Sequence, residues 1–410
     1  MTMRLSAIAA VIAIAATFAG DLAAYSQVPK SIKIGYAISL TGPNAPGAGI
    51  TVLPNYQLWV KEVNDAGGIM LESVGKRVPI EVIEYDDHSN VDDAVGAVER
   101  LISQDKVDFI LSPWGTGLNL AVGPLLHRAG YPHLATTAVS DQAPELGKQW
   151  SNSFWFTGTM TDAVQAFVAT IAKLRSEGKI GNTVATVSVA DQFGIGLAKA
   201  GRKAFKQGGF DVVYDRAYPV ETQDMGAIMR DVKRLNADTF AAFSYPPDTM
   251  MISDQARASN FNPKVFYTAV GTAFPVYKQR FGADVEGVMG IGGWNPDAPE
   301  SKNYIKRHMA ATGQEPDGWA SPITYASLQM LQQAIERVGK VDRGAVIKEL
   351  QTGTFDTILG PVKLEDNLYK QTWWVGQWQN GEFHGIAPTT LPGARPILFP
   401  KPPWHDDADR

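Results

Sequence analysis

Short apolar runs alternate along this chain with segments in which apolar residues recur every three or four positions. Residues 32–38 form the first apolar run, and a loop rich in Gly and Pro follows at 41–47. Apolar residues then lie on one helical face between 53 and 63, and Gly67 is placed to end that helix. The pattern therefore predicts a strand, a loop and a helix in that order.

The strand and helix unit recurs through both halves of the chain. In the first half, further strands are expected at 78–85, 107–111 and 131–135, with helices at 91–102 and 120–128. In the second half, strands are expected at 183–189, 212–218, 239–243 and 264–268, with helices at 196–207 and 225–235. Alternating strands and helices form parallel sheets covered on both faces. The predicted fold class is therefore α/β, with two doubly wound parallel-sheet lobes.

A multi-strand hinge should join the two lobes. If the chain crosses back into the first lobe near Trp294 and again into the second lobe near Ile358, a helix at 325–338 belongs to the first lobe and a strand at 373–378 to the second. We assign residues 30–155 and 294–358 to the N-terminal lobe, and 156–293 and 359–390 to the C-terminal lobe. The Pro-rich tail at 391–410 should wrap the surface or stay disordered. Lobes joined in this way can close on a ligand without unfolding either core.

The N-terminus carries the features of an export signal. Arg4 precedes an apolar run of about 15 residues from Leu5 to Ala19, which is shorter than the ~20 residues of a bilayer-spanning helix. We expect residues 1–24 to be a signal peptide, cleaved near Gly20, and the protein to be periplasmic. A retained membrane anchor is the alternative. The chain has no Cys, which excludes disulfides and lipoprotein anchoring.

Charge and motifs exclude several classes of function. The 37 basic and 42 acidic residues give a net charge of −5 without a basic run, so we expect no nucleic-acid partner. A Walker loop is absent, and Lys199 stands where a dinucleotide site needs its third glycine after Gly194 and Gly196. Asp86 and Asp87 are interpreted as caps of the following helix rather than as metal ligands. We therefore expect no enzyme activity, no catalytic residues, no cofactor and no metal site.

Candidate ligand residues come from the loops that follow the predicted strands. In open α/β sheets the ligand binds beyond the carboxyl ends of the strands. Glycine amides and Thr hydroxyls at helix N-termini suit a carboxylate, and loop aromatics suit an apolar group. The alternative is that the hydroxyls cap helices and the aromatics belong to the core. The candidates are Trp114, Thr116, Thr137, Ser140, Phe193, Tyr245, Val270 and Trp294.

Six short motifs point to a known family. They are LTGP at 40–43, VNDAGGI at 63–69, EYDD at 84–87, DQFGIG at 191–196, TYA at 324–326 and GPV at 360–362. With them the chain resembles, over almost its whole mature length, the periplasmic branched-chain amino acid and amide receptors, the leucine/isoleucine/valine-binding protein-like family. The resemblance implies a type I periplasmic binding protein fold and the role of solute-binding component of an ABC importer. Its partners would be a small-molecule ligand and a membrane permease, and we expect a monomer.

The resemblance also implies roles for individual residues. Thr116 stands in place of the hydroxyl that binds the ligand carboxylate, and Thr137 falls at a second contact in the next loop. Phe193 and Tyr245 match aromatics that close over the ligand from the second lobe. Trp294 matches an aromatic near the hinge.

One departure from the family decides the expected ligand class. The amino-acid receptors hold the ligand ammonium with an acid in the loop where this chain has residues 269–271, Ala-Val-Gly. A buried ammonium without a charge partner is costly, so we expect a small carboxylate without an α-amino group, best an aromatic acid. Asp191 or Asp248 could supply the acid, which leaves a branched-chain amino acid or amide receptor as an alternative. A second alternative function is a ligand-sensing protein for a membrane kinase. The match to the family motifs leaves open which of residues 137, 139 and 140 contacts the ligand.

Overall fold

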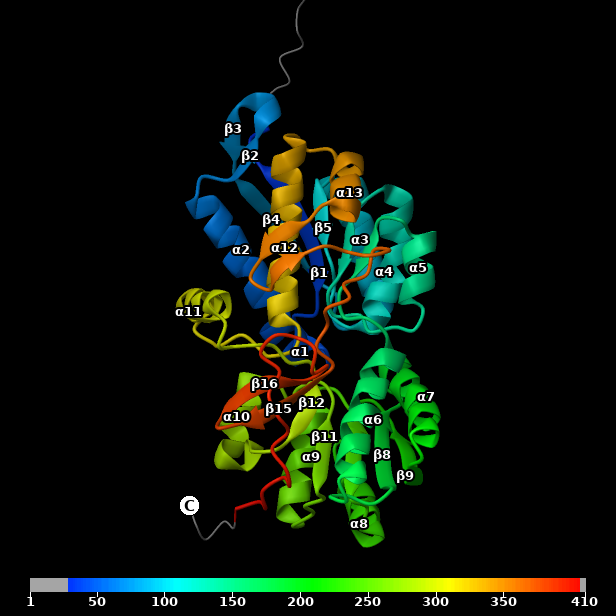
Figure 1. The fold of residues 1–410 in the computed structure, drawn as a ribbon. Coiled ribbons are helices and arrows are strands. Elements are labelled where there is room, and N and C mark those ends of the chain that lie inside the picture. Colours follow the sequence, from blue (N-terminus) through cyan, green and yellow to red (C-terminus); the bar gives the residue numbers. More distant parts are fainter. Residues whose placement is uncertain (1–28, 406–410) are drawn as a thin grey trace, which may run out of the picture.

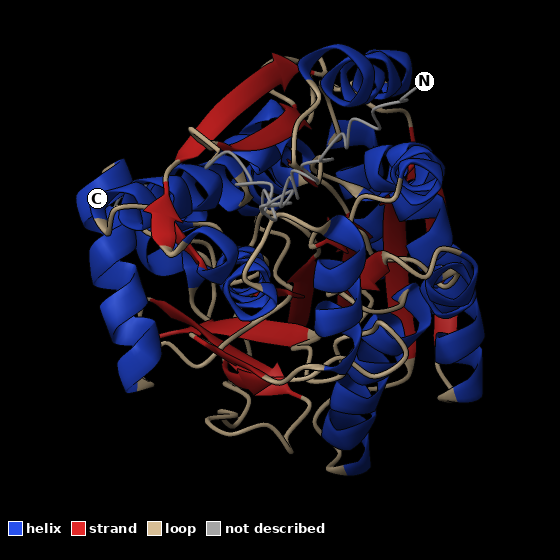
Figure 2. Ribbon diagram, turned by 90° about the horizontal axis from the view of Figure 1, so that it is seen from above, coloured by secondary structure: helices blue, strands red, loops and turns tan. Residues whose placement is uncertain are grey.

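Parallel strands, layered between helices, form the centre of both halves of the protein. The computed structural model describes residues 29–405, and the signal peptide expected at 1–24 lies outside the described residues. Figure 1 shows two lobes, one made of blue, cyan and orange elements and the other of green elements with the red C-terminal strands. Helices surround the strands (Figure 2). The predicted class, α/β with two doubly wound lobes, is confirmed.

The first lobe is built on a parallel sheet of three strands. In sheet order they are β4 (Ile80–Asp86), β1 (Ile32–Ile38) and β5 (Phe109–Leu111). The other strands are the parallel pair β6 (His133–Ala135) and β7 (Ser153–Trp155), and the hairpin β2 (Ile69–Leu71) and β3 (Lys76–Val78). Every residue of β1 except Lys33 is buried, as expected for a parallel strand covered on both faces.

Helices on both faces of β1 bury its side chains. The helices of this lobe are α1 (Ala45–Thr51), α2 (Leu53–Asp65), α3 (Val91–Arg100), α4 (Thr116–Ala129), α5 (Ala143–Gln149), α11 (Pro299–Thr312), α12 (Ser321–Val338) and α13 (Arg343–Thr352). Val98 of α3 and Leu126 of α4 pack in one cluster with Ala37. Tyr56 of α2 belongs to another cluster with Ile34, whose side chain leaves β1 on the opposite face.

The second lobe contains one sheet of seven strands. In sheet order they are β16 (Glu382–Ala387), β15 (Val375–Gln379), β12 (Met289–Ile291), β11 (Val265–Thr268), β10 (Thr239–Phe243), β8 (Thr183–Val189) and β9 (Asp211–Tyr218). The last five are parallel, whereas β15 pairs antiparallel with both β12 and β16. Its helices are α6 (Met160–Ser176), α7 (Gln192–Gln207), α8 (Gly226–Leu235), α9 (Pro246–Ala258) and α10 (Pro275–Phe281). Within residues 29–405, none of the helices has both the length and the apolar character needed to cross a membrane.

Three chain segments cross between the lobes. The first joins β7 to α6, the second joins β12 to α11, and the third runs from the hairpin β13 (Phe355–Thr357) and β14 (Gly360–Val362) to β15. The second and third lie side by side, since the N–H of Gly292 donates to the carbonyl of Trp374 at 3.3 Å. The hairpin packs against α12, so the chain stays with the first lobe past Ile358, where we expected the last crossing.

Helices α4 and α7 begin four residues earlier than the apolar periodicity predicts, at Thr116 and Gln192. The side chain of Asp191 caps α7 by accepting the N–H of Gly194 at 2.8 Å. Helix α4 starts directly after Gly115, whose φ is +94°. The ends of the two loops expected at these points are therefore first turns of helices.

Asp86 and Asp87 do not cap α3, so that expectation is wrong. The side chain of Asn90 caps this helix. Asp86 instead accepts the N–H of Leu40 at 3.0 Å and the hydroxyl of Thr41 at 2.7 Å. The carboxylate thereby ties the loop after β1 to the end of β4.

The described part of the C-terminal tail, residues 391–405, lies against the second lobe. The indole of Trp404 is buried and packs edge-on against Phe266 of β11, with ring centres 5.5 Å apart. Its N–H donates to the carbonyl of Phe261 at 2.8 Å. The tail therefore contributes a buried aromatic side chain to the core of this lobe.

Removing the Trp404 side chain should destabilise the second lobe. We expect Trp404→Ala to lower the free energy of unfolding by about 3 kcal/mol, because a buried indole and its hydrogen bond are lost. Trp404→Phe should recover part of this loss. Leu398→Ala, in an exposed part of the same tail, is the control and should change stability by less than about 0.5 kcal/mol. Urea unfolding followed by circular dichroism measures all three, and equal stabilities would contradict the packing of the tail.

Candidate functional site

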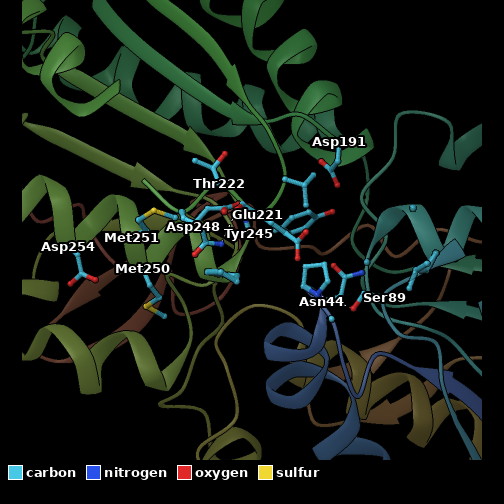
Figure 3. Close-up of a pocket in the computed structure, with 18 of the residues that line it drawn as sticks. Asn44, Ser89, Asp191, Glu221, Thr222, Tyr245, Asp248, Met250, Met251 and Asp254 are labelled. Carbon is cyan, nitrogen blue, oxygen red and sulfur yellow. Dashed lines mark hydrogen bonds between the residues drawn. The ribbon is translucent and has the colours of Figure 1, made fainter. Parts of the chain in front are cut away.

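A cavity of about 780 Å³ opens between the two lobes, and we call it the interlobe cavity. The first lobe contributes the loop after β1 and the first turn of α4. The second lobe contributes the end of β8, the loop after β9 and the first turns of α9. Figure 3 shows Asn44 and Ser89 on the first-lobe side, with Asp191, Glu221 and Tyr245 across from them. The ends of strands from both lobes therefore meet at one site, as expected for open parallel sheets.

Three aromatic side chains singled out from the sequence form a layer that joins the lobes beside this cavity. Tyr245 lines the cavity and stacks on Phe193, with ring centres 5.0 Å apart and an interplanar angle of 17°. Trp114 of the first lobe lies with its ring centre 5.6 Å from that of Tyr245. Trp114 and Phe193 are only 1% and 2% exposed. These three residues, the aromatic layer, make a direct contact between the lobes.

Trp319 extends the aromatic layer, and the sequence reasoning missed it. Its ring meets Trp114 edge-on with centres 6.3 Å apart, and its side chain is buried. The residue lies just before α12. Tyr245 was singled out because it follows a predicted strand, whereas Trp319 follows no predicted strand, so the rule that found Tyr245 did not find Trp319.

The hydroxyls of the first lobe tie neighbouring loops together next to the aromatic layer. Thr116 Oγ1 accepts the N–H of Val139 at 3.2 Å, and Thr137 Oγ1 accepts the N–H of Gly115 at 3.0 Å. Ser140 Oγ accepts a main-chain N–H two residues further on, at 3.1 Å. All three hydroxyl side chains are buried, and none of them caps α4, whose N-cap is Gly115. The structure therefore brings the three candidates together around the start of α4.

The N-terminus of α4 borders the interlobe cavity. Gly115, Gly117 and Leu118 all line it, and no side chain caps this end of the 14-residue helix. The first N–H groups of a helix have no acceptor within the helix, and the positive end of its dipole favours an anion. This edge of the cavity is therefore suited to a carboxylate.

Tyr245 is the one sequence candidate among the described residues that line the interlobe cavity. The other seven are outside that lining: Trp114, Thr116, Thr137, Ser140, Phe193, Val270 and Trp294. Val270 and Trp294 make their contacts elsewhere. Val270 is buried, its N–H donates to the carbonyl of Ser244 at 3.0 Å, and its own carbonyl accepts from Thr249 at 2.7 Å. Trp294 packs edge-on against Tyr304 with centres 6.3 Å apart, and it borders a different cavity at the hinge. The structure does not bring either side chain into the cavity wall.

Carboxylates outnumber bases in that wall. Among the described residues that line the interlobe cavity, the acids are Asp191, Glu221, Asp248 and Asp254, and the base is Arg280. The Nε of Arg280 already donates to Asp254 at 2.9 Å. The second-lobe side of the cavity is therefore acidic, in contrast to the helix end on the first-lobe side.

Asp191 and Asp248 both bond to Tyr245. The Tyr245 hydroxyl donates to the Asp191 carboxylate, and the Tyr245 N–H donates to Asp248 at 3.3 Å. Burial raises the pKa of Asp248 to about 6, and burial also raises the pKa of Asp191. The charge on the second-lobe wall therefore increases as the pH rises toward neutrality.

Replacing Gly47 with Ala should disturb the aromatic layer. A Cβ at Gly47 would lie 2.3 Å from the ring of Trp114, whereas a Cβ at Gly49 in the same helix would meet open space. We expect Gly47→Ala to destabilise the protein by about 1–3 kcal/mol through this overlap and to change its near-ultraviolet circular dichroism. Gly49→Ala is the matched control and should be neutral or slightly stabilising. The same loss of stability in both variants would argue against the close approach of Gly47 to Trp114.

Comparisons with known proteins agree with this geometry. A family model described as periplasmic binding protein matches residues 31–382. Among curated proteins, the Leu/Ile/Val-binding protein homolog 7 of Brucella suis is 23% identical over 398 residues, covering 92% of this chain and 96% of that protein.

Two solved structures share the fold. The branched-chain amino acid transporter substrate binding protein LivJ of Streptococcus pneumoniae, in complex with isoleucine, has a TM-score of 0.74 at 21% identity and covers 86% of this chain and 98% of its own. The solute binding protein of an ABC transporter from R. palustris, in complex with benzoate, has a TM-score of 0.74 at 19% identity, with coverage of 87% and 95%. The family resemblance expected from the motifs is thus confirmed. With a family match over most of its length and this two-lobed fold, the chain belongs to the periplasmic binding protein family.

Proposed function

We propose that this protein is the periplasmic solute-binding component of an ABC importer that closes its two lobes over a small carboxylate, best an aromatic acid. Its partners are that ligand and a membrane permease, and it acts as an exported, non-lipidated monomer without enzyme activity. The names of relatives support the binding role, because they are binding proteins. The three crossing segments support closure by rotation of two rigid lobes.

The aromatic layer beside the N-terminus of α4 is the observation that carries the proposal. The indole N–H of Trp114 is buried and has no acceptor among the described residues, so a ligand oxygen could satisfy it. An aromatic ring held against Tyr245 or Phe193 gains about 0.5–1.5 kcal/mol per ring pair beyond its buried area. The end of α4 meanwhile offers donors and a positive dipole to the carboxylate.

The loop after β11 supports a ligand without an ammonium group. Ala269 and Val270 are buried and uncharged, and Gly271 follows them. None of these three residues lines the interlobe cavity, so this loop supplies no carboxylate there to pair with a ligand ammonium. The R. palustris protein in complex with benzoate has the same fold, which supports an aromatic acid as a ligand suited to this architecture.

A branched-chain amino acid is the second candidate, and Asp191 with Asp248 favours it. Both carboxylates line the interlobe cavity, so either could face a ligand ammonium from a direction other than the loop after β11. The S. pneumoniae protein in complex with isoleucine has the same fold. The two candidate ligands differ in the group that faces the second lobe: an amino acid places a positively charged ammonium there, and an aromatic acid places an uncharged group.

A thermal-shift screen separates these two candidates. At about 100 times its dissociation constant, a ligand adds about 2.7 kcal/mol to the stability of the form that binds it, which raises Tm by about 5–10 °C here. We expect benzoate and hydroxybenzoates to give this shift, and leucine, isoleucine and valine to give none. Phe193→Ala should remove the shift, whereas Val213→Ala, exposed on the same lobe, should keep it. Stabilisation by leucine but not by benzoate would refute the aromatic-acid proposal.

The pH dependence of affinity provides a second test. Because Asp248 gains its charge near pH 6, benzoate should bind about two- to tenfold more weakly as the pH rises from about 5.5 to 7.5. For a ligand with an ammonium group, affinity should instead rise with pH over this range, since the ammonium binds better to the charged carboxylate. Isothermal titration calorimetry at each pH measures the trend. Asp248→Asn should flatten it, and Glu221→Gln, in the same wall but exposed, should leave it in place.

A further inference from the structure

A second cavity, of about 230 Å³, lies at the hinge, and we call it the hinge cavity. Two of its aromatic wall residues belong to crossing segments that lead out of and into the second-lobe sheet: Trp294 follows β12, and Trp373 precedes β15. Tyr369 and Trp319 complete the aromatic part of the wall. Four aromatic side chains thus surround a space large enough for one substituted ring.

The hinge cavity is lined by hydrogen-bond donors that have no acceptor. Trp294, Trp319 and Tyr369 are more than nine-tenths buried, yet no residue within 29–405 accepts a hydrogen bond from their side chains. Burial raises the pKa of Tyr369 to about 12, so its hydroxyl keeps its proton. Buried donors are ordinarily satisfied, by water or by a ligand where the protein supplies no partner. The wall therefore offers these donors to an acceptor oxygen inside the cavity.

The N-terminus of α11 adds donors to the same space. Its N-cap, Ala298, has no capping side chain, and Ser301 in the first turn is buried and lines the cavity. The N–H groups of a first turn lack acceptors within the helix. Glu300 also lines the cavity, whereas no Lys or Arg among the described residues does. A neutral acceptor therefore fits this wall better than a second negative charge.

We propose that the hinge cavity binds a small, neutral aromatic molecule that carries a carbonyl group, such as an aromatic amide. The ring lies among the indoles of Trp294, Trp319 and Trp373. The carbonyl oxygen accepts from the indole N–H groups and the first turn of α11, and an amide N–H donates to Glu300. This site is separate from the interlobe cavity, and only its effect on lobe closure rests on the proposed function.

The position of the hinge cavity couples its occupant to lobe closure. Its walls belong to segments that must change conformation when the lobes rotate, and a ligand that binds one hinge angle better shifts the balance toward it. Trp319 also contacts Trp114, with ring centres 6.3 Å apart, so the hinge cavity and the aromatic layer share one side chain. The occupant is therefore expected to act as an effector of closure.

Fluorine NMR of the full chain labelled with 5-fluorotryptophan tests this proposal, with benzamide as the probe. The resonances of Trp294, Trp373 and Trp114 are assigned through the single variants Trp294→Phe, Trp373→Phe and Trp114→Phe. Saturable shifts of the Trp294 and Trp373 resonances with benzamide are expected. Toluene, which has the ring but no polar group, should shift neither.

Three variants of the cavity wall make the test specific. Ile323→Phe should fill the cavity and abolish the benzamide shifts, whereas the volume-conserving Ile323→Leu should retain them. Ser301→Ala removes one donor and should weaken benzamide binding about two- to tenfold. If Ile323→Phe fails to fold, Ser301→Ala still decides whether the donors at α11 bind the probe.

Three outcomes would overturn the proposal. They are the absence of shifts at Trp294 and Trp373 at millimolar benzamide, shifts confined to Trp114, and equal shifts with toluene. A benzoate titration of the same sample keeps the two ideas apart. Benzoate should shift Trp114 if the proposed function is right, whatever benzamide does at the hinge.

Discussion

The contact between Trp114 and Tyr245 is the constraint on which the site depends. Each lobe supplies one ring from a loop that ends a parallel strand, so neither lobe alone contains the contact. Trp114 has room because Gly47 lacks a side chain, and Tyr245 is held by Phe193 and by the Asp191 carboxylate. A ligand that enters between the lobes must either separate these two rings or pack against both of them.

The two walls of the interlobe cavity have opposite electrostatic character. The first lobe presents the uncapped N-terminus of α4, where neutral donors and a helix dipole favour a negative group. The second lobe presents Asp191 and Asp248, whose burial resists their ionisation. A ligand with a carboxylate at one end and an apolar or neutral group at the other is therefore oriented before the lobes close. This arrangement selects for the direction of the ligand as well as for its class.

Most of the fold could be predicted because buried parallel strands are continuous apolar runs. The strand at 239–243 is an example, since its predicted bounds are those observed. The starts of α4 and α7 were missed because Gly, Thr, Asn and Gln in their first turns interrupt the apolar periodicity. Trp319 was missed, and Trp294 was expected among the ligand residues, for a similar reason. Both belong to irregular segments near the hinge, where no period indicates which way a side chain points.

The discontinuity of the first lobe has a consequence for how the chain acquires its structure. Helix α12 packs against α2 and β2, so the packing partners of residues 53–71 lie more than 250 positions later in the sequence. Contacts of such long range slow folding, because the entropy of closing a large loop is lost before the contact forms. An N-terminal portion made on its own therefore cannot complete its core. The first lobe therefore completes its packing only after α12 (Ser321–Val338) has been synthesised, later than the parallel strands of the second lobe, which lie within residues 183–291.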